Sequence, residues 1–392
     1  MPIIKARCMN YDDVAWAKCD EIFEPWKKKI FERDVLREVG RFVDKHHGGD
    51  GGAAVIRFPI PGTSMFPEEK VQRPFIIMEY INHEGDFIDA LNIPGRSRDD
   101  RPILDPNVSR DRLETVHKFS QIGCIGKADE DDEFDDAWIV KHRPLTFNMN
   151  ELVQLGGVDP AQLPQKVFET ASSYYQALAE MHMIHLASQR HDAIDSVEDC
   201  RQKYIARCLF RKITREHKLC DDDSGPFPLF CDDLRPGNVL ANENHGMTGV
   251  VDWEYTYAAP TGFAHSPPFW LLLELPEFWE GGLNDWTEHY EKVLPTFLKV
   301  MKAKEDSAIE RGALKECDRL SHHMLKSWQS GDFWLNYAAR KSWAFDMIYW
   351  AKIDRRFFGD GDLDDRISLL TAEERGAMDS FVANKLKSIT SP

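Results

Sequence analysis

No stretch of this sequence is apolar for long enough to cross a membrane. A transmembrane helix needs about 18 or more predominantly apolar residues in a row, and polar or charged residues interrupt every apolar run of the chain before that length. Near the N-terminus, Lys5 and Arg7 break up the apolar core that a signal peptide would need. We therefore expect a soluble, cytoplasmic protein, while the mixed charge of the N-terminal stretch leaves a mitochondrial location open.

Paired cysteines and an excess of basic residues are also missing. The eight cysteines never form a C-x-x-C pair, so neither a zinc ribbon nor a thioredoxin-like redox site is expected. Acidic residues outnumber basic ones by 66 to 49, and the formal charge of -17 argues against a general affinity for nucleic acid or for an anionic membrane. An acidic surface would suit a cationic substrate, although surplus carboxylates more often serve only to keep a protein in solution.

What the chain does contain is enough apolar material for a large core and a small sheet. Of its 392 residues, 42% are hydrophobic, which predicts one large or two medium globular domains. Residues 53–58 and 74–81 are apolar, rich in Val and Ile and flanked by turn residues, so both are predicted to be strands. A helix over residues 11–43, with a break near Pro25, is expected before them.

The polar run at residues 82–86 predicts a hinge after this sheet. We therefore place an N-terminal domain at residues 1–82 and a mainly helical domain at residues 83–392. Residues 92–165 are expected to be rich in loops.

Two long helices are predicted in the second domain, over residues 168–190 and 197–217. The second of them is preceded by Ser196, with Asp199 three positions later, which is the spacing of a capping box.

The most informative motif is the run Phe-Cys-Asp-Asp-Leu-Arg-Pro-Gly-Asn-Val-Leu at residues 230–240, followed by Gly-Val-Val-Asp-Trp-Glu at residues 249–254. Phosphoryl transfer needs a carboxylate that orients the acceptor hydroxyl and oxygen ligands that hold magnesium on the phosphates. Asp233 suits the first role, and Asn238 and Asp252 can supply the metal-binding oxygens. Each residue alone is typical of a turn or a strand cap, but their joint spacing beside two apolar strands favours a magnesium–phosphate site.

These two elements resemble the catalytic motifs of the aminoglycoside phosphotransferase family, which consists of protein-kinase-like small-molecule kinases, and above all its large fungal branch. The family motif reads His-Gly-Asp-Leu-x-Pro-x-Asn, and the positions that match it are Asp233, Leu234, Pro236 and Asn238. Cys231 and Asp232 stand in place of its His and Gly. Residues 143–152 and 331–343 also resemble the fungal branch, so the resemblance spans most of the chain from about residue 53.

The resemblance implies an α+β, protein-kinase-like fold of two lobes, with a small N-terminal sheet lobe and a large, mainly helical C-terminal lobe. It implies ATP and Mg²⁺ as cofactors and a hydroxyl of a small molecule as the phosphoryl acceptor. Arg57 takes the place of the phosphate-binding Lys and keeps its positive charge; an edge-strand Arg in water is the alternative. Met78, Glu79 and Tyr80 correspond to the hinge whose backbone receives adenine.

The N-terminal lobe is shorter than the family pattern. Only Gln72 and Arg73 separate the element at residues 66–71 from the second strand, which leaves no room for the helix that carries the acidic partner of the strand cation. Residues 46–52 also lack a clear G-x-G-x-x-G context. We therefore expect a reduced nucleotide-binding lobe, or a gene model that has lost coding sequence. The gap supports a second hypothesis, a catalytically impaired pseudokinase that binds a ligand or a partner protein.

Other reactive residues are weaker candidates. Cys231 is a conceivable nucleophile, but no matched His or activating context accompanies it. His182 and His185 lie three positions apart on an expected helix without an H-E-x-x-H motif, which is more typical of packed or surface histidines than of metal ligands.

Overall fold

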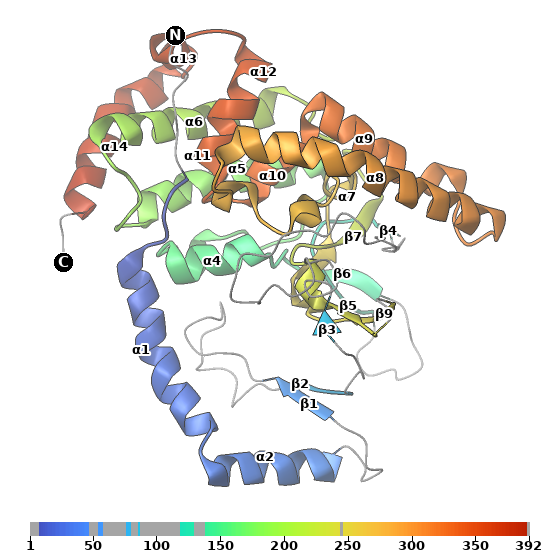
Figure 1. Ribbon diagram of the computed structural model, residues 1–392. Helices are drawn as coiled ribbons and strands as arrows, with labels where there is room; N and C mark the ends of the chain where they lie inside the picture. The colour runs from blue at the N-terminus through green and yellow to red at the C-terminus, as the bar shows by residue number, and fades with distance from the viewer. Residues whose placement is uncertain are drawn as a thin grey trace.

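The protein is a mixed α+β structure in which helices predominate and the sheets are small and antiparallel (Figure 1). The α+β class expected from the sequence is confirmed. The computed structural model describes residues 8–46, 54–57, 76–79, 85–86, 118–128, 138–243 and 246–389.

Two helices open the described part of the chain, α1 (Asp13–Ile30) and α2 (Arg33–His46). Asp12 caps α1 by accepting a hydrogen bond from the Ala15 N–H at 2.9 Å. The predicted break near Pro25 is wrong, because Pro25 lies inside α1 and the chain leaves the helix only at residues 31–32. Since α1 has no buried residue, water can bond the carbonyl that the proline leaves without a partner.

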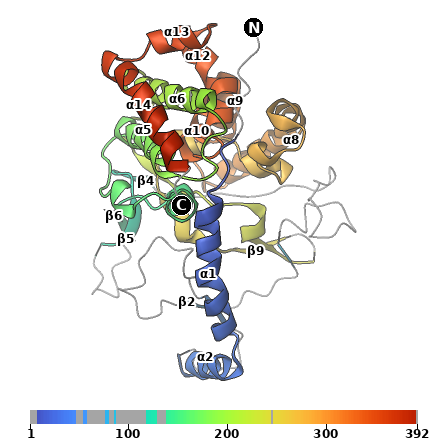
Figure 2. The ribbon, with the colours of Figure 1, turned by 90° about the vertical axis from the view of Figure 1, so that its left-hand side faces the viewer.

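The N-terminal strands are β1 (Ala54–Arg57) and β2 (Ile76–Glu79), which pair antiparallel. Strands within residues 53–58 and 74–81 are thereby confirmed. The predicted domain boundary between residues 82 and 83 lies outside the described residues. Figures 1 and 2 both show α1 running from the helical part of the molecule toward α2, and Figure 1 shows β1 and β2 beside the lower part of this path.

The remaining strands form three small sheets beside the helices. Their orders are β10-β7-β4, β3-β8-β9 and β5-β6. The strands are β3 (Gly85–Asp86), β4 (Lys118–Phe119), β5 (Cys124–Lys127), β6 (Trp138–His142), β7 (Phe227–Cys231), β8 (Val239–Ala241), β9 (Met247–Val250) and β10 (Thr256–Ala258). The motif at residues 230–240 thus begins at the end of β7 and ends in β8, so two different sheets hold its two ends.

The interval at residues 92–165, expected to be rich in loops, contains the helix α4 (Phe147–Leu155) as well as the hairpin β5–β6. Asparagine is typical of turns, yet Asn148 is buried in this helix, where Ser342 satisfies its side-chain amide. The Asn148 Oδ1 accepts from the Ser342 N–H, and its Nδ2 donates to the Ser342 Oγ, both at 3.0 Å. Thr146 caps this helix locally by accepting from the Met149 N–H at 3.2 Å, and a residue 194 positions away satisfies Asn148 inside it.

Long helices make up the core, and both helices predicted in this region are confirmed as α5 (Ala171–Ser188) and α6 (Val197–Glu216). Ser196 caps α6 by accepting from the Asp199 N–H at 3.0 Å. The later helices are α7 (Thr261–Ala264), α8 (Gly282–Glu310), α9 (Ser321–Ser330), α10 (Asp332–Arg340), α11 (Phe345–Ile348), α12 (Asp354–Phe358), α13 (Leu363–Ser368) and α14 (Ala372–Ile389). No helix among the described residues is long and apolar enough to cross a membrane.

A fully buried ion pair joins α6 to α11. Arg207 donates to both carboxylate oxygens of Asp346, at 2.6 and 3.1 Å, and neither side chain is exposed. Arg207 also donates to the main-chain oxygens of His182 and Lys203, at 2.8 and 2.9 Å, so its donors are largely satisfied inside the core.

We predict that Asp346→Ala lowers the free energy of unfolding by about 3–5 kcal/mol, because it leaves the Arg207 charge buried without its partner. Urea unfolding, followed by circular dichroism, measures this change in the free energy of unfolding. The matched control is Asp360→Ala, which breaks the exposed pair of Arg355 and Asp360 (2.7 Å) and should cost less than about 1 kcal/mol. Equal costs for the two variants would contradict the role assigned to the buried pair.

Candidate active site

The chain between β7 and β8 forms a tight loop, which we call the 231–238 loop. It ends in a single 3-10 turn, Pro236–Asn238, with Pro236 at the first position, where its missing N–H is not needed. The Asn238 N–H donates to the Arg235 oxygen at 2.9 Å. At the start of the loop, the Asp232 N–H donates to the Tyr255 oxygen at 3.1 Å, which ties the first motif to the segment that follows the second.

Asn238 is fixed directly against Asp233. Its amide nitrogen donates to the Asp233 main-chain oxygen at 2.8 Å and to the Asp233 carboxylate at 3.2 Å. The Asn238 side chain is buried, with only 3% of the residue exposed. Because the amide is planar and its nitrogen faces Asp233, its Oδ1 is directed away from that carboxylate. The structure thus brings Asp233 and Asn238 together, and the Asn238 Oδ1 lies on the side that faces away from the Asp233 carboxylate.

Main-chain contacts tie the segment just before Asp252 to Asn238. β8 pairs with β9 with Val239 opposite Val250, and the Val251 N–H donates to the Asn238 oxygen at 2.9 Å. Asp252 is therefore the next residue after Val251, whose N–H bonds the main chain of Asn238. Its backbone has φ 62° and ψ 53°, the left-handed region, which residues other than glycine rarely adopt and which recurs at functional sites.

The electrostatics of Asp233 suit a group that exchanges a proton. Burial raises the pKa of its carboxyl, while Arg235, with its Nε 3.3 Å from Oδ1, and the hydrogen bond from Asn238 act in the opposite direction. A carboxylate with a raised pKa is a better proton acceptor than an ordinary aspartate.

The donor chemistry of the loop fits magnesium. Carboxylate and amide oxygens are hard ligands, and Mg²⁺ is commonly held by one or two protein oxygens together with substrate phosphates. Asn238 Oδ1, from the loop, and the Asp252 carboxylate, from the segment after β9, are the two oxygens that would be offered. Among the described residues, no group of three or more His, Cys, Asp or Glu side chains could hold a metal by itself. A metal at this loop would therefore depend on the phosphates for its remaining ligands.

A buried ion pair anchors the loop to the helical core. The Arg340 Nη1 lies 2.8 Å from the Asp232 Oδ1, and both side chains are buried. The guanidinium also lies over the rings of Phe230 and Phe263, at 4.8 and 4.9 Å from their centroids. The second oxygen of Asp232, Oδ2, is buried without a hydrogen-bond partner, so the Asp232 charge depends heavily on Arg340.

Sequence reasoning missed this anchor. Asp232 was recognised only as a departure from the family's Gly, and its partner lies 108 positions further along the chain. The available signal was that Arg340 falls within residues 331–343, which resemble the fungal branch.

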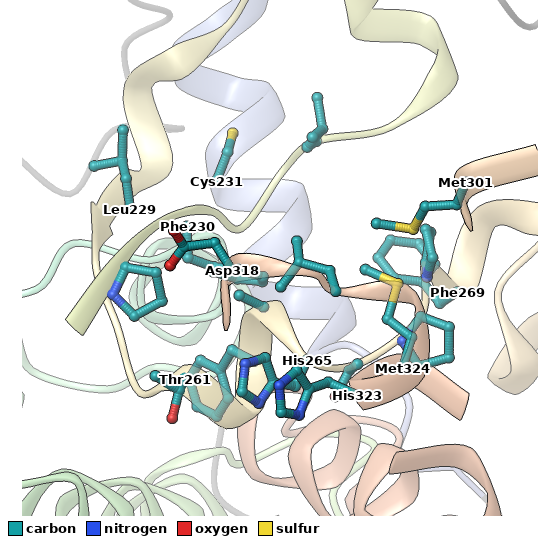
Figure 3. Close-up of a pocket in the computed structure, with 18 of the residues that line it drawn as sticks. Leu229, Phe230, Cys231, Thr261, His265, Phe269, Met301, Asp318, His323 and Met324 are labelled. Atoms are coloured by element: carbon teal, nitrogen blue, oxygen red, sulfur yellow. The ribbon is translucent and has the colours of Figure 1, made fainter. Parts of the chain in front are cut away.

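A pocket of about 520 Å³ lies beside the loop (Figure 3), and we call it the loop pocket. Its walls come from β7, from residues 261–270, from α8 and from α9. Asp232 and Leu234, the two neighbours of Asp233 in the chain, both line it. The pocket thus reaches the chain on either side of the predicted catalytic residue.

The residues expected to bind the nucleotide lie on the N-terminal strands. Arg57 is opposite Ile76 at one end of the β1–β2 pair, and Glu79 is opposite Ala54 at the other end, with Met78 beside it in β2. Tyr80 lies outside the described residues. Figure 1 shows β3 between this strand pair and the helical part of the molecule.

The weaker candidates are placed differently. His182 and His185 are fully buried, and His182 stacks on the Phe345 ring at 4.2 Å. Burial lowers the pKa of His185 to about 3, so both are packed core residues, as expected. Burial raises the pKa of the Cys231 thiol, which is opposite to what a nucleophile requires.

Comparison of the chain with models of known protein families, with curated proteins and with solved structures gave no significant match. The family resemblance therefore rests only on the residues of this sequence described above.

We predict that Arg340→Met destabilises the protein by about 3–5 kcal/mol, because it leaves Asp232 charged and unpaired in the interior. The double variant Asp232→Asn with Arg340→Met should recover a large part of that loss, since it removes the orphaned charge as well. Urea unfolding of the wild type, both single variants and the double variant measures the coupling. Additive costs would show that the two residues do not stabilise each other.

Proposed function

We propose that the protein is an ATP- and magnesium-dependent phosphotransferase with a protein-kinase-like, two-lobe architecture, which transfers the γ-phosphoryl group to a hydroxyl of a small molecule. The observation that carries the proposal is the contact of the Asn238 side-chain amide with Asp233, at 2.8 and 3.2 Å. It is joined by the hydrogen bond that the Val251 N–H donates to the main-chain oxygen of Asn238. These contacts gather one proton acceptor and two hard oxygen ligands on neighbouring pieces of backbone.

The chemistry asked of the chain is mainly positioning and charge. Asp233 would orient the acceptor hydroxyl and take its proton as the hydroxyl oxygen bonds to the γ-phosphorus. The bond from that phosphorus to the bridging oxygen breaks, and ADP leaves with its electron pair. Asn238 and Asp252 would hold magnesium, which neutralises charge on the phosphates when it is bound.

The N-terminal lobe, residues 1–82, would supply the rest of the nucleotide site. Arg57 would contact phosphate oxygens, and the main chain at Met78, Glu79 and Tyr80 would receive the adenine. The C-terminal lobe, residues 83–392, carries the loop. A cytoplasmic location is part of the proposal and agrees with the eight free cysteines; neither nucleic acid nor a membrane is among the proposed partners.

A binding protein without catalytic activity is the second candidate. Within the described residues, the N-terminal sheet consists of β1 and β2 alone, which is little structure to clamp a nucleotide. A pseudokinase of this kind would keep the loop as a ligand-binding element and lose turnover.

We predict that Asp233→Asn lowers the turnover of ATP to ADP by about 10²–10⁴-fold, since it removes the proton acceptor, while magnesium-ATP still raises the melting temperature. Asp252→Ala should abolish both turnover and the thermal shift. The matched control is Asp192→Ala, because Asp192 is exposed and also has a positive φ, 55°; it should change neither property.

The outcomes separate the two candidates. If magnesium-ATP raises the melting temperature without turnover, the binding protein is supported. If magnesium-ATP neither binds nor turns over and Asp252→Ala has no effect, the phosphotransferase proposal fails.

The pH dependence of kcat/KM provides a second test. Because burial raises the pKa of Asp233, activity should fall on the acid side at a pH above about 3.9, the ordinary value for aspartate. Arg235 lowers that pKa, so Arg235→Gln should move the acid limb to higher pH, whereas Arg235→Lys should leave it nearly in place. An acid limb that Arg235→Gln leaves unmoved would argue against Asp233 as the base.

A further inference from the structure

The size and lining of the loop pocket suit a small organic molecule. Its volume of about 520 Å³ falls within the range of ligand pockets, roughly 300–1,000 Å³. The wall is largely aromatic and aliphatic, and its apolar members include Leu229, Phe230, Phe269, Trp270, Met301 and Met324. Figure 3 shows Phe269, Met301 and Met324 grouped together on one side of the pocket.

The charged residues of the wall balance one another. Four are basic and four are acidic: Lys118, Lys304, Arg319 and Arg340, and Asp222, Asp232, Glu305 and Asp318. Several are already paired inside the wall. Lys118 lies 2.6 Å from Asp318, and Arg319 lies 3.5 Å from Glu305. The pocket therefore lacks the surplus of carboxylates that a polycation would need, although the whole chain has a formal charge of -17.

Two neutral imidazoles are among the polar groups of the wall. His265 and His323 stack with their centroids 4.1 Å apart and their planes 4° from parallel, and Figure 3 shows them side by side in the pocket. Burial lowers the pKa of His265 to about 4, and burial together with His322 lowers that of His323. A neutral imidazole can both donate and accept a hydrogen bond, so this pair suits an uncharged polar ligand better than one that carries an ammonium group.

We infer that the loop pocket binds an uncharged molecule with an aromatic body and a hydroxyl group, and that this molecule is the phosphoryl acceptor. The second statement rests on the proposed function. Asp232 and Leu234 line the pocket on both sides of Asp233, so a molecule held there lies next to the proposed catalytic loop. This acceptor differs from the cationic one that net charge alone suggests.

A matched pair of ligands tests the pocket without nucleotide. We would measure by calorimetry the binding of 2-naphthaleneethanol and of 2-naphthaleneethylamine, which share a ring and differ in hydroxyl against ammonium. The alcohol should bind at least about tenfold more tightly. An amine that binds as tightly as the alcohol, or an alcohol that does not bind, would overturn the inference.

Variants on one helix locate the binding. Met301→Gln changes a half-buried residue of α8 that lines the pocket, and it should weaken the binding of the alcohol by about tenfold. The control is Ala303→Gln, an exposed residue two positions along that does not line the pocket, and it should leave the affinity unchanged. Val300→Gln, also in the lining, replaces Met301→Gln if that variant does not fold. Equal effects of lining and control variants would place the alcohol elsewhere and overturn the inference.

A separate readout distinguishes this inference from the proposed function. Mass spectrometry after incubation with magnesium-ATP detects the phosphate ester of the alcohol, which is expected. Binding in the pocket without nucleotide binding or turnover would uphold the pocket and sink the phosphotransferase. Turnover of ATP without any binding of the alcohol would uphold the enzyme and overturn the acceptor assigned to it.

Discussion

The buried ion pair of Asp232 and Arg340 is the constraint on which the candidate site depends. It fixes the 231–238 loop to α10, where both side chains are buried and where one oxygen of Asp232 has no hydrogen-bond partner. Asp233, the next residue, then lies against Asn238. The main-chain oxygen of Asn238 accepts a hydrogen bond from the N–H of Val251, the residue before Asp252. The geometry of the loop is thus set from within the helical core as much as by its own turn residues.

Local chemistry explains which parts of the fold were predictable from sequence. The strands β1 and β2 have β-branched runs, and α6 has a Ser cap, so neighbouring residues suffice to specify them. The helix α4 was not predicted, and its buried Asn148 is satisfied by Ser342, far along the chain. Pro25 was misread because an exposed helix tolerates a proline that a buried one would not. Both failures concern the surroundings of a residue, which a local pattern does not contain.

In the candidate site, too, some residues were predictable from the sequence and others were not. Asp233, Asn238 and Asp252 were proposed from the sequence because phosphoryl transfer requires a fixed spacing of oxygen groups, and that spacing is legible in one chain. The Arg340 anchor and the loop pocket were not, since their residues come from separate elements that only the fold assembles. Net charge does not describe the pocket, because the charged residues of its lining are balanced in a strongly acidic protein. A catalytic motif does not determine an acceptor, whereas the walls of a pocket constrain one.

The central claim is that the Asn238 and Asp252 oxygens hold a divalent metal on bound phosphates. Electron paramagnetic resonance with Mn²⁺ and ATP tests it most directly, because Mn²⁺ accepts the oxygen ligands that suit Mg²⁺. We expect a protein-bound Mn²⁺ signal that requires ATP, that is lost in Asn238→Ala and Asp252→Ala, and that persists in Asp233→Asn. A bound signal of equal strength in Asn238→Ala and Asp252→Ala would contradict the account.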